Sequence, residues 1–85
     1  MIIRVTSKFR KSYRKLPKIV KIKAQEREKI FRDDPFDLRL DTHKLHGKYK
    51  DYWAFTVVGQ HRIMFVFINS GRVDFINIGT HEIYK

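Results

Sequence analysis

Residues 45–84 read LHGKYKDYWAFTVVGQHRIMFVFINSGRVDFINIGTHEIY, and this stretch decides the fold. It contains three runs rich in β-branched and aromatic residues, which favour strands. Gly59-Gln60 and Asn69-Ser70-Gly71 separate the runs, and short connections that contain glycine are typical of hairpins. We therefore predict three consecutive antiparallel strands, at Trp53–Val58, His61–Ile68 and Arg72–Ile78.

The hairpins also predict which residues face one another. If Gly59-Gln60 is a two-residue loop with glycine first, as type II′ turns prefer, Val57 lies opposite Arg62. The same register gives the further pairs Phe55–Met64 and Trp53–Val66.

The second hairpin extends this geometry to the end of the chain. In either plausible register, Arg62 falls beside Ile78 or Gly79. We therefore expect Arg62 and His81 to lie near each other, although nineteen residues separate them.

The first half of the chain predicts a strand followed by two helices. Ile2–Val5 has the composition of a short strand. Thr6 offers an N-cap for a helix with apolar residues at helical spacing. Pro17 suits the start of a second helix, which ends before Pro35 because the residue preceding a proline avoids helical dihedrals. We expect residues 35–50 to form an irregular connection.

These elements predict an α+β fold with the order β-α-α-β-β-β, in which a two-helix hairpin packs on an antiparallel β-sheet. A length of 85 residues gives one domain, residues 1–85. The chain has no cysteine, so we expect neither a disulfide nor a thiolate metal site. The N-terminus lacks the apolar segment of a signal peptide, and no apolar run approaches the length of a membrane helix. We expect a soluble cytoplasmic protein.

The charge of the chain is strongly basic and uneven. The formal net charge is +10, and nine Lys or Arg residues but no acidic residue occur from Met1 to Gln25. Such a basic stripe is typical of nucleic-acid binding, although a solvated helix face or an acidic protein partner is also compatible with it. The candidate contacts to RNA or the ribosome are Lys8, Arg10, Lys11, Arg14, Lys15, Lys18, Lys21, Lys48, Lys50 and His61.

Histidines and one arginine provide the best candidates for chemistry. No nucleophile motif or glycine-rich phosphate loop is present, and the spacing of His43 and His46 matches no known metal pattern, so we expect no cofactor. Metal-free cleavage of RNA needs a base for the ribose 2′-OH, a fixed cation for the phosphate and an acid for the leaving oxygen. Histidine serves as base or acid near neutral pH, and arginine supplies a permanent charge matched to phosphate. The candidate catalytic residues are His43, Arg62, His81 and Tyr84.

Each candidate also has a purely structural interpretation. Arg62 could pair with Asp74 or Asp51 at the edge of the core. His43 could be a surface histidine, and His81 could simply end a strand. Tyr84 could pack the C-terminus, while His61 beside its turn and Trp53 in its strand fit structural roles better than functional ones.

Several short motifs together resemble a known family. Leu45-x-Gly47, Tyr52-Trp53, His61-Arg62-Ile63-Met64-Phe65 and Gly79-Thr80-His81 with Tyr84 occur in an order similar to that of the RelE/YoeB/YafQ bacterial toxins. The resemblance implies a RelE-like microbial RNase fold and cleavage of mRNA in the ribosomal A site. It also implies a cognate antitoxin that wraps the toxin and blocks it.

The resemblance assigns roles at matching positions. Arg62 matches the family arginine that stabilises the transition state, and His81 matches the C-terminal histidine of the YoeB and YafQ types, here the acid. His43 falls where these types place a glutamate or a histidine, here the base, and Tyr84 matches the C-terminal aromatic residue one position closer to the histidine.

Two other functions fit part of the sequence. The ParE toxins, which share this fold, inhibit DNA gyrase without cutting RNA. A plain RNA-binding module would use the basic charge but leave Arg62 and His81 unexplained. Histidines at positions 43 and 81 favour the ribonuclease over both alternatives.

Overall fold

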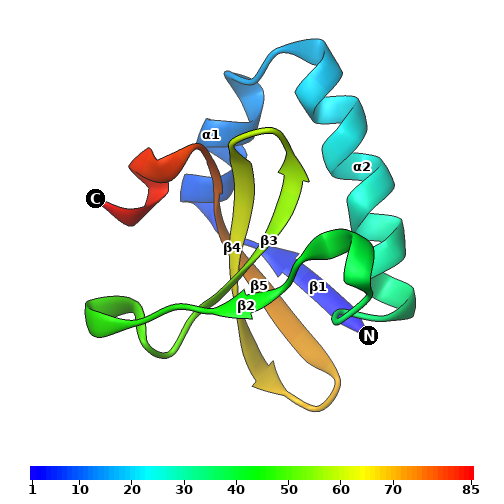
Figure 1. Ribbon diagram of the computed structural model, residues 1–85, viewed down its shortest axis with the longest axis vertical. Helices are drawn as coiled ribbons and strands as arrows, with labels where there is room; N and C mark the ends of the chain where they lie inside the picture. Colours follow the sequence, from blue (N-terminus) through cyan, green and yellow to red (C-terminus); the bar gives the residue numbers. More distant parts are fainter.

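The computed structural model describes all 85 residues and contains a five-stranded sheet with two helices (Figure 1). The sheet order is β1-β5-β4-β3-β2. Three short 3₁₀ helices, η1 to η3, lie before and after β2 and at the C-terminus. In chain order the elements are β1 (Ile2–Val5), α1 (Ser7–Arg14), α2 (Lys18–Asp33), η1 (Leu38–Leu40), β2 (His43–Lys44), η2 (Gly47–Tyr49), β3 (Trp53–Val58), β4 (His61–Asn69), β5 (Arg72–Gly79) and η3 (His81–Tyr84).

The predicted α+β class and element order are confirmed, but the sheet is mixed rather than antiparallel. β1 runs parallel to β5, with Ile2 opposite Arg72 and Val5 opposite Phe75. A parallel pair needs a long connection, which here contains α1, α2 and the β3–β4 hairpin. The second difference is β2, which lies in the region expected to be irregular. It has two exposed residues, too few to produce an alternating pattern.

The helices begin for the reasons that the sequence indicates. The Thr6 hydroxyl accepts a hydrogen bond from the amide of Phe9, as an N-cap does, and donates to the carbonyl of Ile76 in β5. The start of α1 is therefore fixed to the sheet. Pro17 takes the N-cap position of α2, one residue before the predicted first turn. Neither helix is long and apolar enough to cross a membrane.

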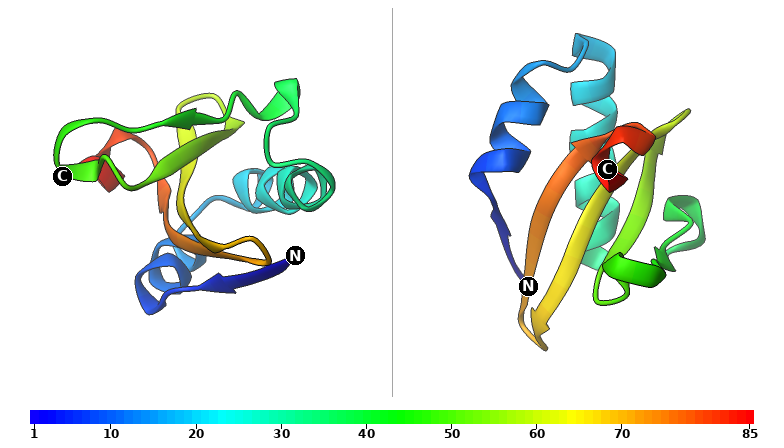
Figure 2. Two further views of the ribbon diagram at one scale, coloured as in Figure 1. Left: turned by 90° about the horizontal axis from the view of Figure 1, so that it is seen from below. Right: turned by 90° about the vertical axis from the view of Figure 1, so that its left-hand side faces the viewer.

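The core lies between α2 and one face of the curved sheet (Figure 2). Phe31 of α2 is fully buried, and its ring lies 4.9–5.5 Å from the rings of Phe55, Phe65 and Phe75. Aromatic pairs at these separations add to the free energy gained from burial alone. The C-terminal η3 lies on the other side of the sheet from α2 (Figure 2).

A β-bulge changes the register of the β3–β4 hairpin. Val58 faces His61, as a two-residue loop requires, but the next pair is Thr56 with Arg62 and Val57 has no partner. The predicted pairing of Val57 with Arg62 is therefore wrong. The predicted pairs Phe55–Met64 and Trp53–Val66 are wrong as well, because Phe55 faces Ile63 and Trp53 faces Phe65. In the second hairpin, Arg62 faces Gly79, so that prediction is confirmed.

Candidate functional site

Arg62 projects from the face of the sheet that the helices leave uncovered. Its neighbour Ile63 pairs with Phe55 and Ile78 in the core beneath the helices. Because side chains alternate along a strand, Arg62 and its partner Thr56 point the other way. The bulge at Val57 accommodates this arrangement, because it pairs Arg62 with Thr56 and not with the buried Val57.

The guanidinium of Arg62 makes hydrogen bonds only to backbone carbonyl groups. Its Nη1 donates to the carbonyls of Gly59 at 2.7 Å and His61 at 3.1 Å. The carboxylate of Asp74 is occupied by Arg72 at 2.9 Å, and Asp51 forms no ion pair. The structural interpretation in which Arg62 pairs with Asp74 or Asp51 is therefore wrong. Its charge is not neutralised by any carboxylate.

Gly79 lets η3 approach the sheet beside Arg62. Its φ is +158°, and a Cβ atom there would lie 3.0 Å from the side chain of Ile83. Any side chain at this position would therefore meet the buried Ile83. The last residues consequently fold back next to the strand pair that carries Arg62.

Tyr84 is the candidate residue that shows an interaction with Arg62. Burial raises the pKa of the Tyr84 phenol, and the positive charge of Arg62 opposes part of that rise. The phenol therefore stays protonated at neutral pH and can donate a proton or a hydrogen bond. His81 begins η3, two residues after the partner of Arg62, and its side chain is exposed and makes no hydrogen bond.

His43 is exposed on β2 and lies on the same face of the sheet as Arg62. It pairs with Ala54, which is two residues from Thr56 along β3 and therefore shares its face. His43 Nδ1 lies 2.9 Å from the carbonyl oxygen of Asp41. A carbonyl only accepts, so in this contact Nδ1 carries the hydrogen and Nε2 of the neutral ring is free to take a proton. Asp41 adopts the left-handed conformation, with φ of 50°, that presents this carbonyl.

The remaining predicted contact residues lie in several places. His61 is half-buried beside the hairpin turn, next to Arg62. Lys15 lines a small groove with Thr80, which precedes η3, and Glu82 of η3. Lys21 lies over the ring of Tyr13. The others are exposed on α1, at the start of α2 and around η2, namely Lys8, Arg10, Lys11, Arg14, Lys18, Lys48 and Lys50.

Tyr49 is a neighbour of the site that the sequence interpretation missed. Its ring centroid lies 6.2 Å from that of Tyr84 and 6.2 Å from that of Tyr52. The Nζ of Lys48 lies 5.1 Å from the centre of the Tyr49 ring. Three tyrosine rings and a lysine thus lie next to one another around η2 and Tyr84. The signal in the sequence was the pair of tyrosines at 49 and 52 with lysines at 48 and 50.

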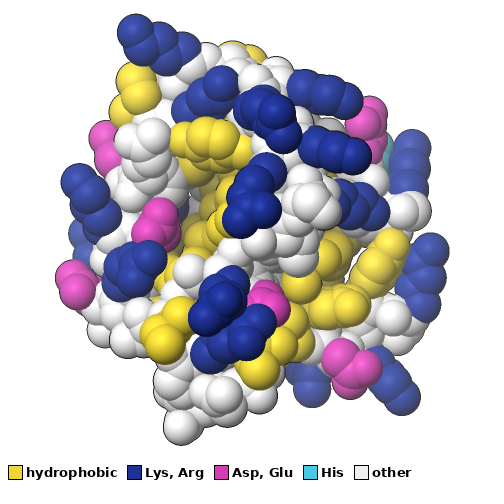
Figure 3. Space-filling view, turned by 180° about the vertical axis from the view of Figure 1, so that it is seen from behind, with side chains coloured by type: hydrophobic (Ala, Val, Ile, Leu, Met, Phe, Trp, Pro, Cys, Tyr) yellow, Lys and Arg dark blue, Asp and Glu magenta, His cyan; other side chains and the backbone are white.

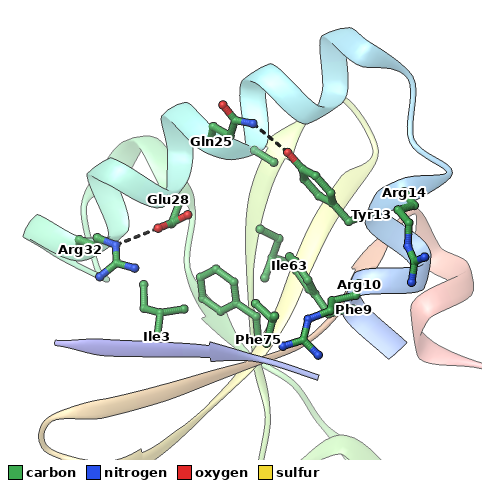
Figure 4. Close-up of a pocket in the computed structure, with 12 residues that line it drawn as sticks. Ile3, Phe9, Arg10, Tyr13, Arg14, Gln25, Glu28, Arg32, Ile63 and Phe75 are labelled. Atoms are coloured by element: carbon green, nitrogen blue, oxygen red, sulfur yellow. Dashed lines mark hydrogen bonds and ion pairs between the residues drawn. The ribbon is translucent and has the colours of Figure 1, made fainter. Parts of the chain in front are cut away.

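A second feature lies between the two helices and β1, away from the candidate catalytic residues. Apolar side chains line a hollow on the back of the molecule, and many Lys and Arg side chains surround it (Figure 3). The hollow has a volume of about 460 Å³, and Ile3, Phe9 and Phe75 contribute apolar walls. Arg10, Arg14 and Arg32 lie along it, with Glu28 as the one acidic residue (Figure 4). We call this feature the interhelical cleft.

No cluster of three or more His, Asp or Glu side chains has the geometry to hold a metal ion. His43 and His46 do not form one with any neighbouring carboxylate. The open face presents Arg62 as a permanent cation and an exposed histidine at position 43, and the charge of Arg62 acts on the protonated phenol of Tyr84.

Comparison with known proteins identifies the fold. No family model matches the sequence, and no curated protein matches it in sequence. Among solved structures, the YoeB/ParE toxin from Agrobacterium tumefaciens superposes with a TM-score of 0.81 at 20% identity, covering 95% of this chain and 99% of that one. The chain has a RelE-like fold. YafQ from E. coli strain BL21(DE3) gives a TM-score of 0.79 at 17% identity, covering 96% and 94% of the two chains.

Other proteins with the RelE-like fold were solved together with a partner. The RelE–RelB complex from Pyrococcus horikoshii OT3 matches with a TM-score of 0.73 at 18% identity, covering 93% of this chain and 92% of that chain. At such identities the similarity establishes the fold, and the fold implied by the sequence motifs is thereby confirmed. Activity must be argued from the residues on the open face.

Proposed function

We propose that residues 1–85 form the toxin of a type II toxin–antitoxin system, an endoribonuclease that cuts mRNA in the ribosomal A site. The observation that carries the proposal is the unpaired charge of Arg62 on the open face. The charge of Arg62 acts on the protonated phenol of Tyr84, and His43, whose Nδ1 contacts the Asp41 carbonyl, lies on the same face as Arg62. The fold similarity to RelE, YoeB and YafQ toxins supports the same conclusion.

In the proposed reaction, His43, Arg62, His81 and Tyr84 each have one role, and no metal is required. His43 Nε2 removes the proton from the ribose 2′-OH, and the resulting oxygen attacks the adjacent phosphorus. Arg62 stabilises the negative charge that gathers on the phosphate oxygens. The bond from phosphorus to the 5′-oxygen breaks, and His81 protonates that oxygen while Tyr84 donates a hydrogen bond to the phosphate. The products carry a 2′,3′-cyclic phosphate and a 5′-hydroxyl.

The basic residues supply affinity rather than chemistry. Lys48 and Lys50 flank the aromatic rings beside Tyr84, and Lys15 lies beside η3. Contacts from such side chains to RNA phosphates act through counterion release, so binding should weaken steeply as salt increases. The ribosome and its mRNA are therefore the proposed nucleic-acid partners, in the cytoplasm where translation takes place.

The interhelical cleft fits the proposed protein partner, a cognate antitoxin. An apolar hollow flanked by three arginines complements an amphipathic segment with acidic residues along its edges. The RelE relative from Pyrococcus horikoshii OT3 was crystallised with RelB, and YafQ with DinJ. A small acidic protein encoded by the adjacent reading frame is the expected partner, and co-purification of the two would demonstrate it.

Toeprinting on translating ribosomes tests the proposed activity. The wild-type protein should produce new mRNA ends in the A site, and Arg62→Ala and His81→Ala should abolish them while the proteins remain folded. Intact mRNA with the wild-type protein would refute the proposal.

A gyrase inhibitor is the second candidate, because one matching structure is described as a YoeB/ParE toxin. This function predicts cleaved plasmid trapped by the protein in a supercoiling assay. Absence of such plasmid, together with A-site cleavage, removes this candidate.

A further inference from the structure

The bulge at Val57 in β3 sets the register in which Arg62 pairs with Thr56. Without the extra residue, Arg62 would pair with Val57, whose side chain is fully buried in the core with that of Phe55. A shift of one residue in a strand exchanges its two faces. The bulge therefore allows Val57 to point into the core while Arg62, opposite Thr56, points toward the open face, and it sets the register of β3 against β4.

One side chain from α2 contacts this bulge directly. The half-buried Arg27 donates a hydrogen bond from Nε to the carbonyl oxygen of Val57 at 3.2 Å. The extra residue of a bulge is left outside the regular ladder of hydrogen bonds, so a donor from elsewhere can stabilise it. Arg27 lies thirty residues earlier in the sequence and approaches from the core side of the sheet.

The same guanidinium also reaches the segment that leads to His43. Its Nη1 lies 3.5 Å from the carbonyl oxygen of Arg39, in η1. Its charge also contributes to the low pKa of Asp37, about 2, which is caused mainly by hydrogen bonds from Arg39. Two residues after Arg39, Asp41 presents the carbonyl that fixes His43 Nδ1. Arg27 thus joins β3 to the start of the His43 segment.

We propose that Arg27 is a positioning residue that holds the Val57 bulge and the η1 segment together, and so sets Arg62 and His43 on the same face in register. The expected loss of cleavage rate rests on the proposed ribonuclease function, whereas the expected change in strand register does not. Arg27 lies on the core side of the sheet and contacts neither substrate nor reacting atoms. Its loss should lower the rate of the chemical step and leave RNA affinity unchanged.

The test compares Arg27→Met with Lys29→Met. Both variants remove one positive charge from α2, but Lys29 is exposed and has no hydrogen bond or ion pair in the structure. We expect Arg27→Met to reduce kcat for ribosome-dependent cleavage about 10²-fold, because small displacements of catalytic groups have effects of this size. KM should change by less than about twofold for both variants, since the contacts to RNA remain.

Arg27→Gln is the conservative variant. Its amide can donate to one carbonyl, so it should restore part of the lost kcat. It also keeps the test valid if Arg27→Met proves too unstable to assay, because Gln retains a polar donor at a half-buried position.

Cross-strand nuclear Overhauser effects in the same proteins report the register independently of activity. The Thr56–Arg62 contact should be present in the wild type and in Lys29→Met, and lost or exchanging with a Val57–Arg62 contact in Arg27→Met. An unchanged register, or a changed register with unchanged kcat, would overturn the inference. If the wild-type protein cuts no RNA, the proposed function fails, and the register measurement still decides whether Arg27 holds the bulge.

Discussion

The two faces of the sheet are built from different interactions. On the helix side, Phe31, Phe55, Phe65 and Phe75 pack ring against ring and exclude water. On the open side, Arg62 and His43 are held by hydrogen bonds to backbone carbonyls and not by packing. Burial stabilises the first face, and local backbone geometry positions the groups on the second. The two should therefore respond differently to substitution.

The largest effect is expected from truncating the centre of the helix-side core. Phe31→Ala removes a fully buried ring and should lower the free energy of unfolding by about 3–5 kcal/mol. Denaturant unfolding would measure this loss. Leu38→Ala is the matched control, because the Leu38 side chain is 96% exposed and its loss should cost less than about 0.5 kcal/mol.

The second-largest effect is expected on the open face, in activity alone. Arg62→Ala should reduce the cleavage rate about 10³-fold, because the charge that stabilises the transition state is removed. The unfolding temperature of Arg62→Ala should stay close to that of the wild type. Arg4→Ala removes an arginine from the exposed part of β1 and should leave the rate unchanged. Equal rates for the two variants would exclude a role for Arg62 in the chemistry.

Replacing the proposed base should have a somewhat smaller effect. His43→Gln should lower kcat about 10²-fold, the scale on which general base catalysis acts. His46→Gln, three residues along and also exposed, is the control expected to keep full activity. Comparable losses in both variants would mean that His43 contributes to RNA contact and not to proton transfer.

The smallest effect concerns pH. Burial raises the pKa of Tyr84 above its ordinary value of 10.0, so the folded protein holds this proton more tightly than the unfolded chain. The resulting stability is fully present below pH 10 and is lost as the pH rises through the higher, folded pKa. The unfolding temperature of the wild type should therefore fall more steeply above pH 10 than the unfolding temperature of Tyr84→Phe. Parallel curves would show that Tyr84 is not buried as described.

The sequence predicted those parts of the fold that depend on local patterns. The strands from Trp53 to Gly79 follow from runs of β-branched and aromatic residues separated by short turns, and the N-cap follows from the residue type of Thr6. The same turns predicted that Arg62 lies beside Ile78 or Gly79, and it faces Gly79. The bulge at Val57 could not be predicted, because it depends on core packing and on Arg27, thirty residues away in the sequence.

The parallel pairing of β1 with β5 also depends on contacts between the two ends of the chain. For the site, residue types indicated the candidates. The contact between His43 Nδ1 and the carbonyl of Asp41 arises from the left-handed conformation of Asp41. No local sequence pattern predicts that conformation. The assignment of His81 as the acid remains a prediction.

The most direct measurement of the central claim is the chemistry of the RNA ends. A metal-free attack by the ribose 2′-OH, assisted from the open face, leaves one fragment with a 2′,3′-cyclic phosphate and the other with a 5′-hydroxyl. Mass spectrometry of fragments made by the wild-type protein on ribosomes, with EDTA present only during isolation, would identify both ends. We predict a cyclic phosphate and a 5′-hydroxyl, whereas a 3′-hydroxyl with a 5′-phosphate would contradict the proposed mechanism.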